Sequence, residues 1–550
     1  MRPASLAGAL LLALAGICSA QETPPAQPAG ESNFLSRFFG GADKTQLSKL
    51  RGVPYQTSNQ AIGVDLDLLD RRAAGYGLVS APALEQYANA VLRKLKEASG
   101  IPGLPGTVYI SATDDMAAQT TADGNIFISY RWFDNLNNPR LKRGQEDTLA
   151  ALLAHELGHI ALGHHNSDFF ANAAKWAQSY YAQAMLVKAA LEKKLDGQIP
   201  LPEQAKKNLV KMQYVVEIID SMAHPAWKRG QEEDADAFAI DLTHAAGYTY
   251  QEGVKRFLEL NNSAEEVQNQ RKTARLAALQ ADVDASLKVG KVDVAINGIG
   301  TQLSQQLQGL LTATHPDSTA RITKTSAYAE KFYPREWIED AEAPVSDQYR
   351  KVAMSKDNLE LIEMYNGAFE LEGMFASLTT EGVREALGKG EKLTRKVGLK
   401  NVDRNNWLLF YEYARTMRYA SDLGQQAPLA SALPAAPPPK AGRKKASPAA
   451  APVLKLEEVE EALTVGETAM SFKPYQDRIK LALQSGHSDL ALSILARTDK
   501  KFELARSTLP GTIGFYARAG KAERATELVS LCQKKYIDMR DECAKASQIK

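Results

Sequence analysis

The stretch LAALLAHELGHIALGHH, residues 149–165, places His155, Glu156 and His159 inside an otherwise apolar run. Burying such polar side chains without partners costs several kcal/mol, so the stretch predicts a helix whose polar groups share a partner. We expect this helix to run through 150–162, with the acidic residues of QED at 145–147 in its first turn, where negative charge is favourable. The question raised by this stretch is what that partner is.

The spacing of the two histidines indicates a metal ion. His155 and His159 are four residues apart, which on a helix separates them by about 40° around the axis and about 6 Å along it. Both imidazole rings can therefore reach one tetrahedral zinc. Glu156 is then placed to take the proton of a zinc-bound water, which is the general-base role in the HExxH pattern. The sequence predicts one Zn²⁺ per chain.

A catalytic zinc requires a third protein ligand, and two alternatives remain open. His165 lies ten residues after His155, at the distance used by metzincins. That pattern needs a turn glycine at position 162, where this chain has Leu162, and Gly163 comes one position late. The other alternative is a carboxylate further along the chain.

That carboxylate lies in GQEEDADAFAIDL, residues 230–242, where Glu232 and Asp236 are four apart on an expected helix. Glu232 would complete the zinc site. Asp236 would accept the second ring N–H of a ligating histidine and fix its tautomer. The buried face of this helix is expected to consist of Ala235, Phe238, Ala239 and Leu242. An acidic run can also be a solvated helix face, which is the other interpretation of the segment.

HELGH followed by EEDAD resembles the signature of the gluzincins, specifically the HtpX/BepA-like zinc metallopeptidase family. The resemblance covers roughly residues 60–330 and includes DDMAAQTTADGNIFIS at 114–129 and THPDSTARI at 314–322. It implies that zinc is bound by His155, His159 and Glu232, that Glu156 is the base, and that Asp236 orients a ligand.

The same resemblance draws attention to His315 and Arg321, which match the family's HPxxxxRI element. Either residue could have a regulatory or substrate-binding role, and His315 could approach the zinc as a latch. A loop histidine bonded to backbone and a helix surface charge are the simpler interpretations.

The N-terminal sequence predicts export. Arg2, the apolar run LAGALLLALAGI and the small residues before Gln21 are typical of a signal peptide, residues 1–20, and imply the periplasm. A lipoprotein anchored through Cys18 is the alternative. No later run is apolar enough to span a bilayer, so we expect no integral membrane span after cleavage. With 66 basic against 65 acidic residues, the overall charge does not favour nucleic acid as a partner.

The expected fold is α+β and mainly helical, with a small sheet before the metal helix. The predicted divisions are a disordered linker at 21–50, a zinc peptidase domain at 51–335, a helical extension at 336–428, a Pro/Ala-rich linker at 429–453 and a helical domain at 454–550. The Pro/Ala-rich composition of the linker at 429–453 predicts that the last domain is only weakly coupled, mechanically, to the rest of the chain.

The C-terminal domain contains an internal repeat. Gly486 aligns with Gly520 and Ala491 with Ala525, in each case 34 residues apart, which is the tetratricopeptide period. An unrelated pair of α-hairpins is the alternative. Cys532 and Cys543, the two cysteines that remain after cleavage, permit one disulfide only if the chain turns between them.

These features predict an exported zinc-dependent metalloendopeptidase that acts on misfolded or unassembled cell-envelope proteins. Its substrates would be proteins or peptides, and its C-terminal helices could bind an outer-membrane assembly partner. The alternative is a zinc-containing chaperone or scaffold for envelope protein assembly with little proteolysis. Hydrolysis that depends on Glu156 separates the two hypotheses.

Overall fold

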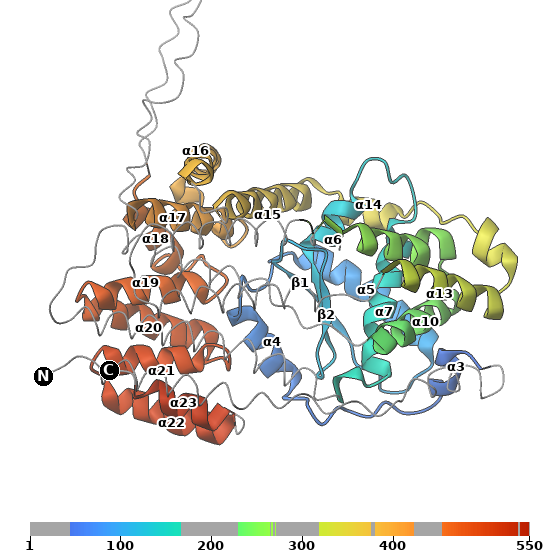
Figure 1. Ribbon diagram of the computed structural model, residues 1–550, viewed down its shortest axis with the longest axis horizontal. Helices are drawn as coiled ribbons and strands as arrows, with labels where there is room; N and C mark the ends of the chain where they lie inside the picture. Colours follow the sequence, from blue (N-terminus) through green and yellow to red (C-terminus); the bar gives the residue numbers. More distant parts are fainter. Residues whose placement is uncertain are drawn as a thin grey trace, which may run out of the picture.

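A computed structural model describes residues 44–166, 229–264, 266–267, 270, 318–375, 380–422, 454–536 and 539–548. The predicted signal peptide, residues 21–43 of the linker predicted at 21–50, the linker predicted at 429–453 and His315 lie outside these ranges. Residues 46–50 of the first predicted linker form a short helix instead. The described part is mainly helical with one small sheet, as the sequence predicts (Figure 1).

The half of the molecule that carries the HExxH motif, here called the metal half, surrounds this sheet with helices (Figure 1). Its elements are α3 (Gln46–Leu50), α4 (Val64–Ala73), α5 (Pro82–Ser99), β1 (Thr107–Ser111), β2 (Ala118–Thr120), β3 (Asn125–Ser129), α6 (Tyr130–Leu136), α7 (Gln145–Ala161), a 3-10 turn (His164–Asn166), α10 (Arg229–Ala245), a π-helical turn (Tyr250–Lys255), α13 (Ser318–Phe332) and a second π-helical turn (Glu336–Asp340).

The sheet has three strands in the order β1-β3-β2. β1 runs parallel to β3, and β2 runs antiparallel to it. Every residue of β3 is buried, in keeping with its apolar sequence NIFIS. The sequence analysis expects a small sheet before the metal helix, and this sheet is present, with β2 at its edge.

The two helices that carry the predicted metal ligands pack closely. Residues 145–160 of α7 are almost all buried, which explains why that helix lacks a polar face. Gly158 makes the approach of α10 possible, because a Cβ at this position would lie 3.2 Å from the Cα of Ala235 and 3.2 Å from a ring carbon of Phe238. The glycine of HELGH therefore sets the distance between α7 and α10.

A helical extension follows the metal half. It consists of α14 (Asp347–Ala353), α15 (Lys356–Phe375), α16 (Thr380–Val397), a 3-10 turn (Leu399–Asn401) and α17 (Trp407–Asp422). α15, α16 and α17 pack on one another. Within the part of the chain that the structure covers, no helix combines the length and the apolar character needed to cross a membrane.

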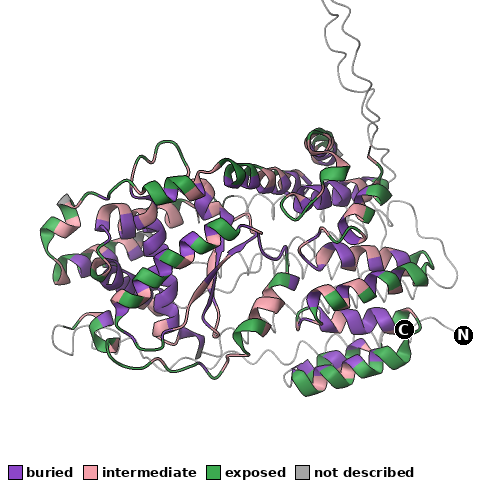
Figure 2. Cartoon of the chain, turned by 180° about the vertical axis from the view of Figure 1, so that it is seen from behind, coloured by how far each residue is buried: buried purple, intermediate pink, exposed green. Residues whose placement is uncertain are grey.

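Six further helices form what is here called the C-terminal half. They are α18 (Leu456–Thr464), α19 (Lys473–Gln484), α20 (Ser488–Phe502), α21 (Leu509–Arg518), α22 (Ala522–Lys535) and α23 (Arg540–Ala546). α19 packs on α20, and α21 packs on α22, with buried residues between the helices and exposed residues outside (Figure 2). Gly486 and Gly520 turn the chain within each pair, at φ values of 74° and 76° that favour glycine.

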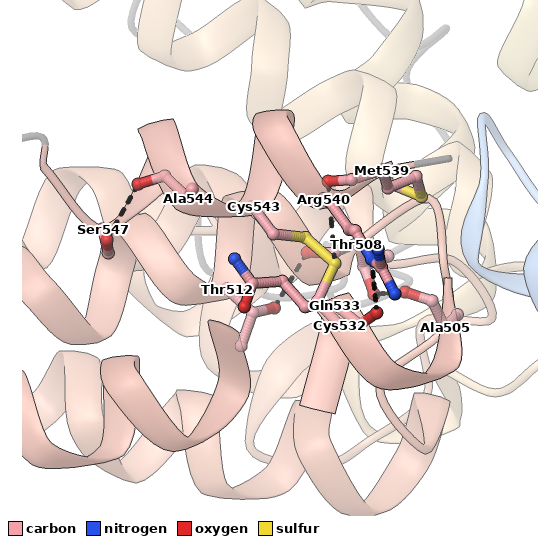
Figure 3. The surroundings of a disulfide bond; sticks show 10 residues. All are labelled: Ala505, Thr508, Thr512, Cys532, Gln533, Met539, Arg540, Cys543, Ala544 and Ser547. Carbon is pink, nitrogen blue, oxygen red and sulfur yellow. Dashed lines mark hydrogen bonds between the residues drawn. A yellow bond between two sulfur atoms is a disulfide. The ribbon is translucent and has the colours of Figure 1, made fainter. Parts of the chain in front are cut away.

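Cys532 and Cys543 form a disulfide that joins α22 to α23 (Figure 3). Their Cα atoms are 6.4 Å apart, because α22 ends at Lys535 and the chain turns before α23 begins at Arg540. The turn that the sequence analysis requires for this pairing is therefore present.

The C-terminal half packs directly against the metal half. The N–H of Phe472 donates to the carbonyl of Ala73 over 3.4 Å, and the hydroxyl of Ser471 donates to the carbonyl of Gly75. Ser507 donates to Asp70 at the end of α4. The weak mechanical coupling expected from the Pro/Ala-rich linker is thus wrong for the described helices, because backbone contacts join the two halves without the linker.

Candidate metal centre

Three side chains from α7 and α10 bring their donor atoms to one point. The Nε2 atoms of His155 and His159 are 3.1 Å apart. The carboxylate of Glu232 completes the set, with Oε2 3.4 Å from Nε2 of His155 and Oε1 3.6 Å from Nε2 of His159. All three residues are buried, and their ligand atoms could hold a metal ion.

This donor set fits zinc. Tetrahedral coordination with bonds of about 2.0–2.1 Å places ligand atoms roughly 3.3–3.4 Å apart, close to the separations observed here. Two imidazoles and one carboxylate are also the donor types that catalytic zinc takes as its protein ligands. Burial holds the pKa of His159 well below its usual value, so its ring is neutral, as metal binding requires.

The second nitrogen of His155 is held by a carboxylate. Nδ1 of His155 lies 2.9 Å from Oδ1 of Asp236, one turn beyond Glu232 on α10. Burial lowers the pKa of His155, but hydrogen bonds to Asp236 and Glu232 raise it to about 10. A metal bound at Nε2 would replace the proton there and leave the N–H at Nδ1 to donate to Asp236. Asp236 thus lies within hydrogen-bond distance of a predicted metal ligand, and its role in fixing the tautomer stays a prediction.

Arg321 of α13 neutralises the two carboxylates. Its Nε and Nη2 donate to the two oxygens of Asp236, each over 2.9 Å, and its Nη1 lies 3.2 Å from Oε2 of Glu232. Burial alone would raise the pKa of both acids, but Arg321 and His155 hold each at about 2. Arg321 is itself buried, so it lies against the ligand set rather than on a helix surface.

The second nitrogen of His159 has a different partner. Its Nδ1 lies 2.7 Å from Nδ1 of His164, in the 3-10 turn that follows α7. Burial lowers the pKa of His164 to about 4, so this ring is neutral. The sequence analysis gives His164 no role, and the signal for it is its place five residues after His159, just past the end of the helix.

Glu156 lies beside the ligand set without belonging to it. Its side chain is buried, and its Oε2 has no hydrogen-bond partner among the residues that the structure describes. Burial, together with the nearby Glu232, raises the pKa of Glu156 to about 7. A buried carboxylate oxygen without a donor is suited to accept a proton from a ligand in the site.

One of the two remaining predicted residues, His165, lies outside the ligand set. His165, the metzincin alternative, points its Nε2 to the hydroxyl of Thr120 in β2 over 2.9 Å and is not part of the His155, His159, Glu232 group. His315 lies outside the described residues, so the latch hypothesis stays a prediction.

Comparison with known proteins agrees with this geometry. No curated protein matches the chain. Residues 82–329 match the family described as Peptidase family M48, and the match spans the sheet, α7, α10 and most of α13. This match supports an M48 zinc metallopeptidase family for the part of the chain that carries the site.

Proposed function

We propose that this protein is a zinc-dependent metalloendopeptidase with the HExxH gluzincin mechanism. The observation that carries the proposal is the convergence of His155, His159 and Glu232 beside Glu156, within the segment that matches a peptidase family. Zinc held by these three residues would act as a Lewis acid toward the scissile carbonyl and toward water.

The protein's own side chains have separate roles in the reaction. Glu156 takes the proton of the attacking water and delivers it to the leaving amine, for which a pKa near neutrality is suited. Asp236 holds the ring of His155, and Arg321 keeps Glu232 and Asp236 ionised. The buried walls formed by α7 and α10 limit the access of bulk water to the reacting groups.

The geometry of the edge strand β2 is the reason we propose an extended polypeptide as the substrate. Ala117 accepts from Ser129 and Thr121 donates to Asn125, which directs the backbone groups of Ala118 and Thr120 away from β3. β2 also packs beside α7. An extended peptide that added to this edge would pass close to the ligand set, in the manner of β-strand addition.

The proposal extends to where the protein acts. The predicted N-terminal signal sequence and the disulfide between α22 and α23 both suit an oxidising compartment, and we propose that the protein acts in the periplasm. The two helix pairs spaced 34 residues apart are consistent with a tetratricopeptide-like domain of the soluble BepA-like type. Such a domain would bind unassembled envelope proteins or an outer-membrane assembly partner.

The test is purification with metal analysis, followed by incubation of wild type and Glu156→Gln with an unfolded protein such as casein. We expect one zinc per chain in both forms. The variant should lose hydrolysis by a factor of about 10²–10⁴, because it lacks only the proton acceptor. A chelator should abolish the wild-type activity, and added zinc should restore it.

The same experiment decides between the peptidase and the alternative of a zinc-containing chaperone. If Glu156→Gln degrades casein as fast as wild type, the peptidase mechanism is wrong. If both forms bind zinc, neither hydrolyses casein, and both suppress its aggregation equally, the zinc-containing half acts as a scaffold.

A further inference from the structure

Two adjacent histidines at the end of the metal helix contact different parts of the site. The chain leaves α7 through Gly163, whose φ of 67° reverses its direction and returns the 3-10 turn toward the ligand set. His164 then reaches the metal ligand His159, and His165 reaches Thr120 of β2. His164 and His165 are both buried, although imidazoles are polar and this turn is short.

The contact between His159 and His164 has one consistent proton arrangement. Nε2 of His159 faces His155 and Glu232. To bind a metal, this nitrogen must carry no proton, so that its lone pair is available. The ring proton of His159 is then on Nδ1, 2.7 Å from Nδ1 of His164. His164 must accept this hydrogen bond and carry its own proton on Nε2. In this arrangement, His164 stabilises the tautomer of His159 that metal binding requires.

The contact between His165 and Thr120 anchors the same turn to the sheet. Nε2 of His165 lies 2.9 Å from the hydroxyl of Thr120, and both residues are buried. Thr120 belongs to the edge strand β2, and its backbone groups point away from β3. A further contact, from the side-chain amide of Gln231 to the carbonyl of His164 over 3.3 Å, ties the turn to the start of α10.

We propose that His164 is a positioning residue for the metal site, and that His165 holds His164 in place by anchoring its turn to the edge strand β2. The inference rests on the zinc site of the proposed function. It assigns the neighbouring histidines two different tasks. One orients the ring of a metal ligand, and the other links that ring to the strand on which an extended peptide would lie.

The first test compares His164→Leu with His164→Asn. Leucine fills similar space but cannot accept a hydrogen bond, whereas the side-chain oxygen of asparagine lies near the position of Nδ1. Zinc affinity is measured by competition with a chromophoric chelator, without any substrate. We expect His164→Leu to bind zinc roughly 10–100-fold more weakly than wild type, as outer partners of metal ligands do, and His164→Asn to recover most of the loss.

The control is His487→Leu, which removes an exposed histidine of the C-terminal half and should leave the zinc affinity unchanged. Circular dichroism of the metal-free proteins establishes that each variant is folded. If His164→Leu does not fold, His164→Asn and the Thr120 variant below carry the test. Equal zinc affinity in wild type and a folded His164→Leu would overturn the proposal.

The second test examines the anchor through a double-mutant cycle. Thr120→Val removes the hydroxyl that contacts His165 and keeps the shape of the side chain. We expect it to weaken zinc binding less than His164→Leu does, and to have no further effect when His164 is already leucine, because the two contacts act in series. Equal effects of Thr120→Val in the two backgrounds would show that the anchor does not act through His164.

These measurements are independent of catalysis. If wild type binds zinc but hydrolyses no peptide, the proposed function fails while the affinity series still decides the role of His164. If the affinity series shows no effect and casein is degraded, the proposed function stands and the positioning role is wrong.

Discussion

The metal half and the C-terminal half are both built from packed helix pairs, yet they are held together in different ways. Between α7 and α10, the buried groups include two histidines, three carboxylates and, from α13, a guanidinium. The core between α19 and α22 consists mostly of apolar side chains, and the disulfide lies at its far end (Figures 2 and 3).

The difference teaches what each half depends on. Buried charges are favourable only when every one has its partner, and removing one partner commonly costs about 3–5 kcal/mol. An apolar core and a disulfide stabilise a fold without any bound ligand. We therefore expect changes at the buried polar groups around the ligand set to act on metal binding, and changes at the disulfide to act on the stability of the C-terminal half.

The strongest effect is expected from Glu232→Gln. An amide is a poor zinc ligand and leaves Arg321 facing one carboxylate instead of two, so zinc affinity should fall by more than the roughly 10–100-fold typical of an outer partner. Metal analysis after dialysis measures the loss. Glu233→Gln is the matched control, because Glu233 is the next residue on α10, is equally buried and pairs with Lys324 outside the ligand set.

If Glu233→Gln lost zinc to the same extent as Glu232→Gln, the contrast between the two carboxylates would fail. Retention of zinc by Glu232→Gln together with its loss in His165→Ala would favour the metzincin alternative.

The position of Glu232 also illustrates how far the sequence reaches. The four-residue spacings of His155 with His159 and of Glu232 with Asp236 depend only on helix periodicity, so their shared faces are predictable. Arg321 could be singled out by family resemblance, but not its contacts with Glu232 and Asp236, which depend on how α13 packs on α10. The role of His164 depends on the turn after α7, which has no periodic pattern.

The C-terminal half shows the same limit. Gly486 and Gly520 mark turns that a 34-residue repeat makes visible. The contact of Ser471 and Phe472 with residues 73–75 joins segments about 400 residues apart, and neither segment has an unusual composition. The Pro/Ala-rich linker predicts that the C-terminal half moves independently of the metal half. Nothing in its composition indicates that the helices after it pack against the metal half.

The second effect is expected from Cys532→Ala combined with Cys543→Ala. Opening a loop with a sequence separation of 11 should lower the stability of α21–α23 by about 3 kcal/mol, because the unfolded chain gains freedom. Hydrogen exchange resolved along the chain measures this loss. Zinc affinity and hydrolysis of a small peptide should stay at the wild-type level, since the disulfide contacts only its own half. A fall in zinc affinity would break the proposed separation between the halves.

A third, smaller effect concerns the contact between the halves and compares Gly77→Ala with Gly75→Ala. Both glycines have positive φ, 70° and 53°, so alanine strains each by about 1–2 kcal/mol. A Cβ at Gly77 would also lie 2.8 Å from the carbonyl oxygens of Arg72 and Met470, whereas a Cβ at Gly75 meets nothing within 4 Å.

Gly77→Ala should therefore loosen the docking of the C-terminal half by roughly 1–3 kcal/mol beyond the effect of Gly75→Ala. Faster hydrogen exchange at residues 470–476, measured in the full chain, is the readout. Equal exchange in the two variants would mean that this contact does not hold the halves together.

The smallest effect is a pH dependence within the metal half, away from the ligands. Asp241 of α10 is buried, and it accepts hydrogen bonds from the N–H of Leu47 and the hydroxyls of Tyr328 and Tyr333. Burial raises the pKa of this carboxyl from 3.8 to about 6, although these hydrogen bonds lower it. The folded state therefore holds the proton more tightly than the unfolded state, and stability falls as the pH rises from about 4 through 6.

As the pH rises from 5 to 7, the ionisation of Asp241 should lower the free energy of unfolding by about 1 kcal/mol. Asp241→Asn cannot titrate, so its free energy of unfolding should decline less steeply over this range than that of wild type, whatever its absolute value. Urea unfolding at half-unit pH steps, monitored for the metal half by tryptophan fluorescence, gives the two slopes. The ligand residues titrate alike in both proteins and cancel in the difference. Parallel slopes would mean that the hydrogen bonds from Leu47, Tyr328 and Tyr333 outweigh burial and keep Asp241 ionised throughout.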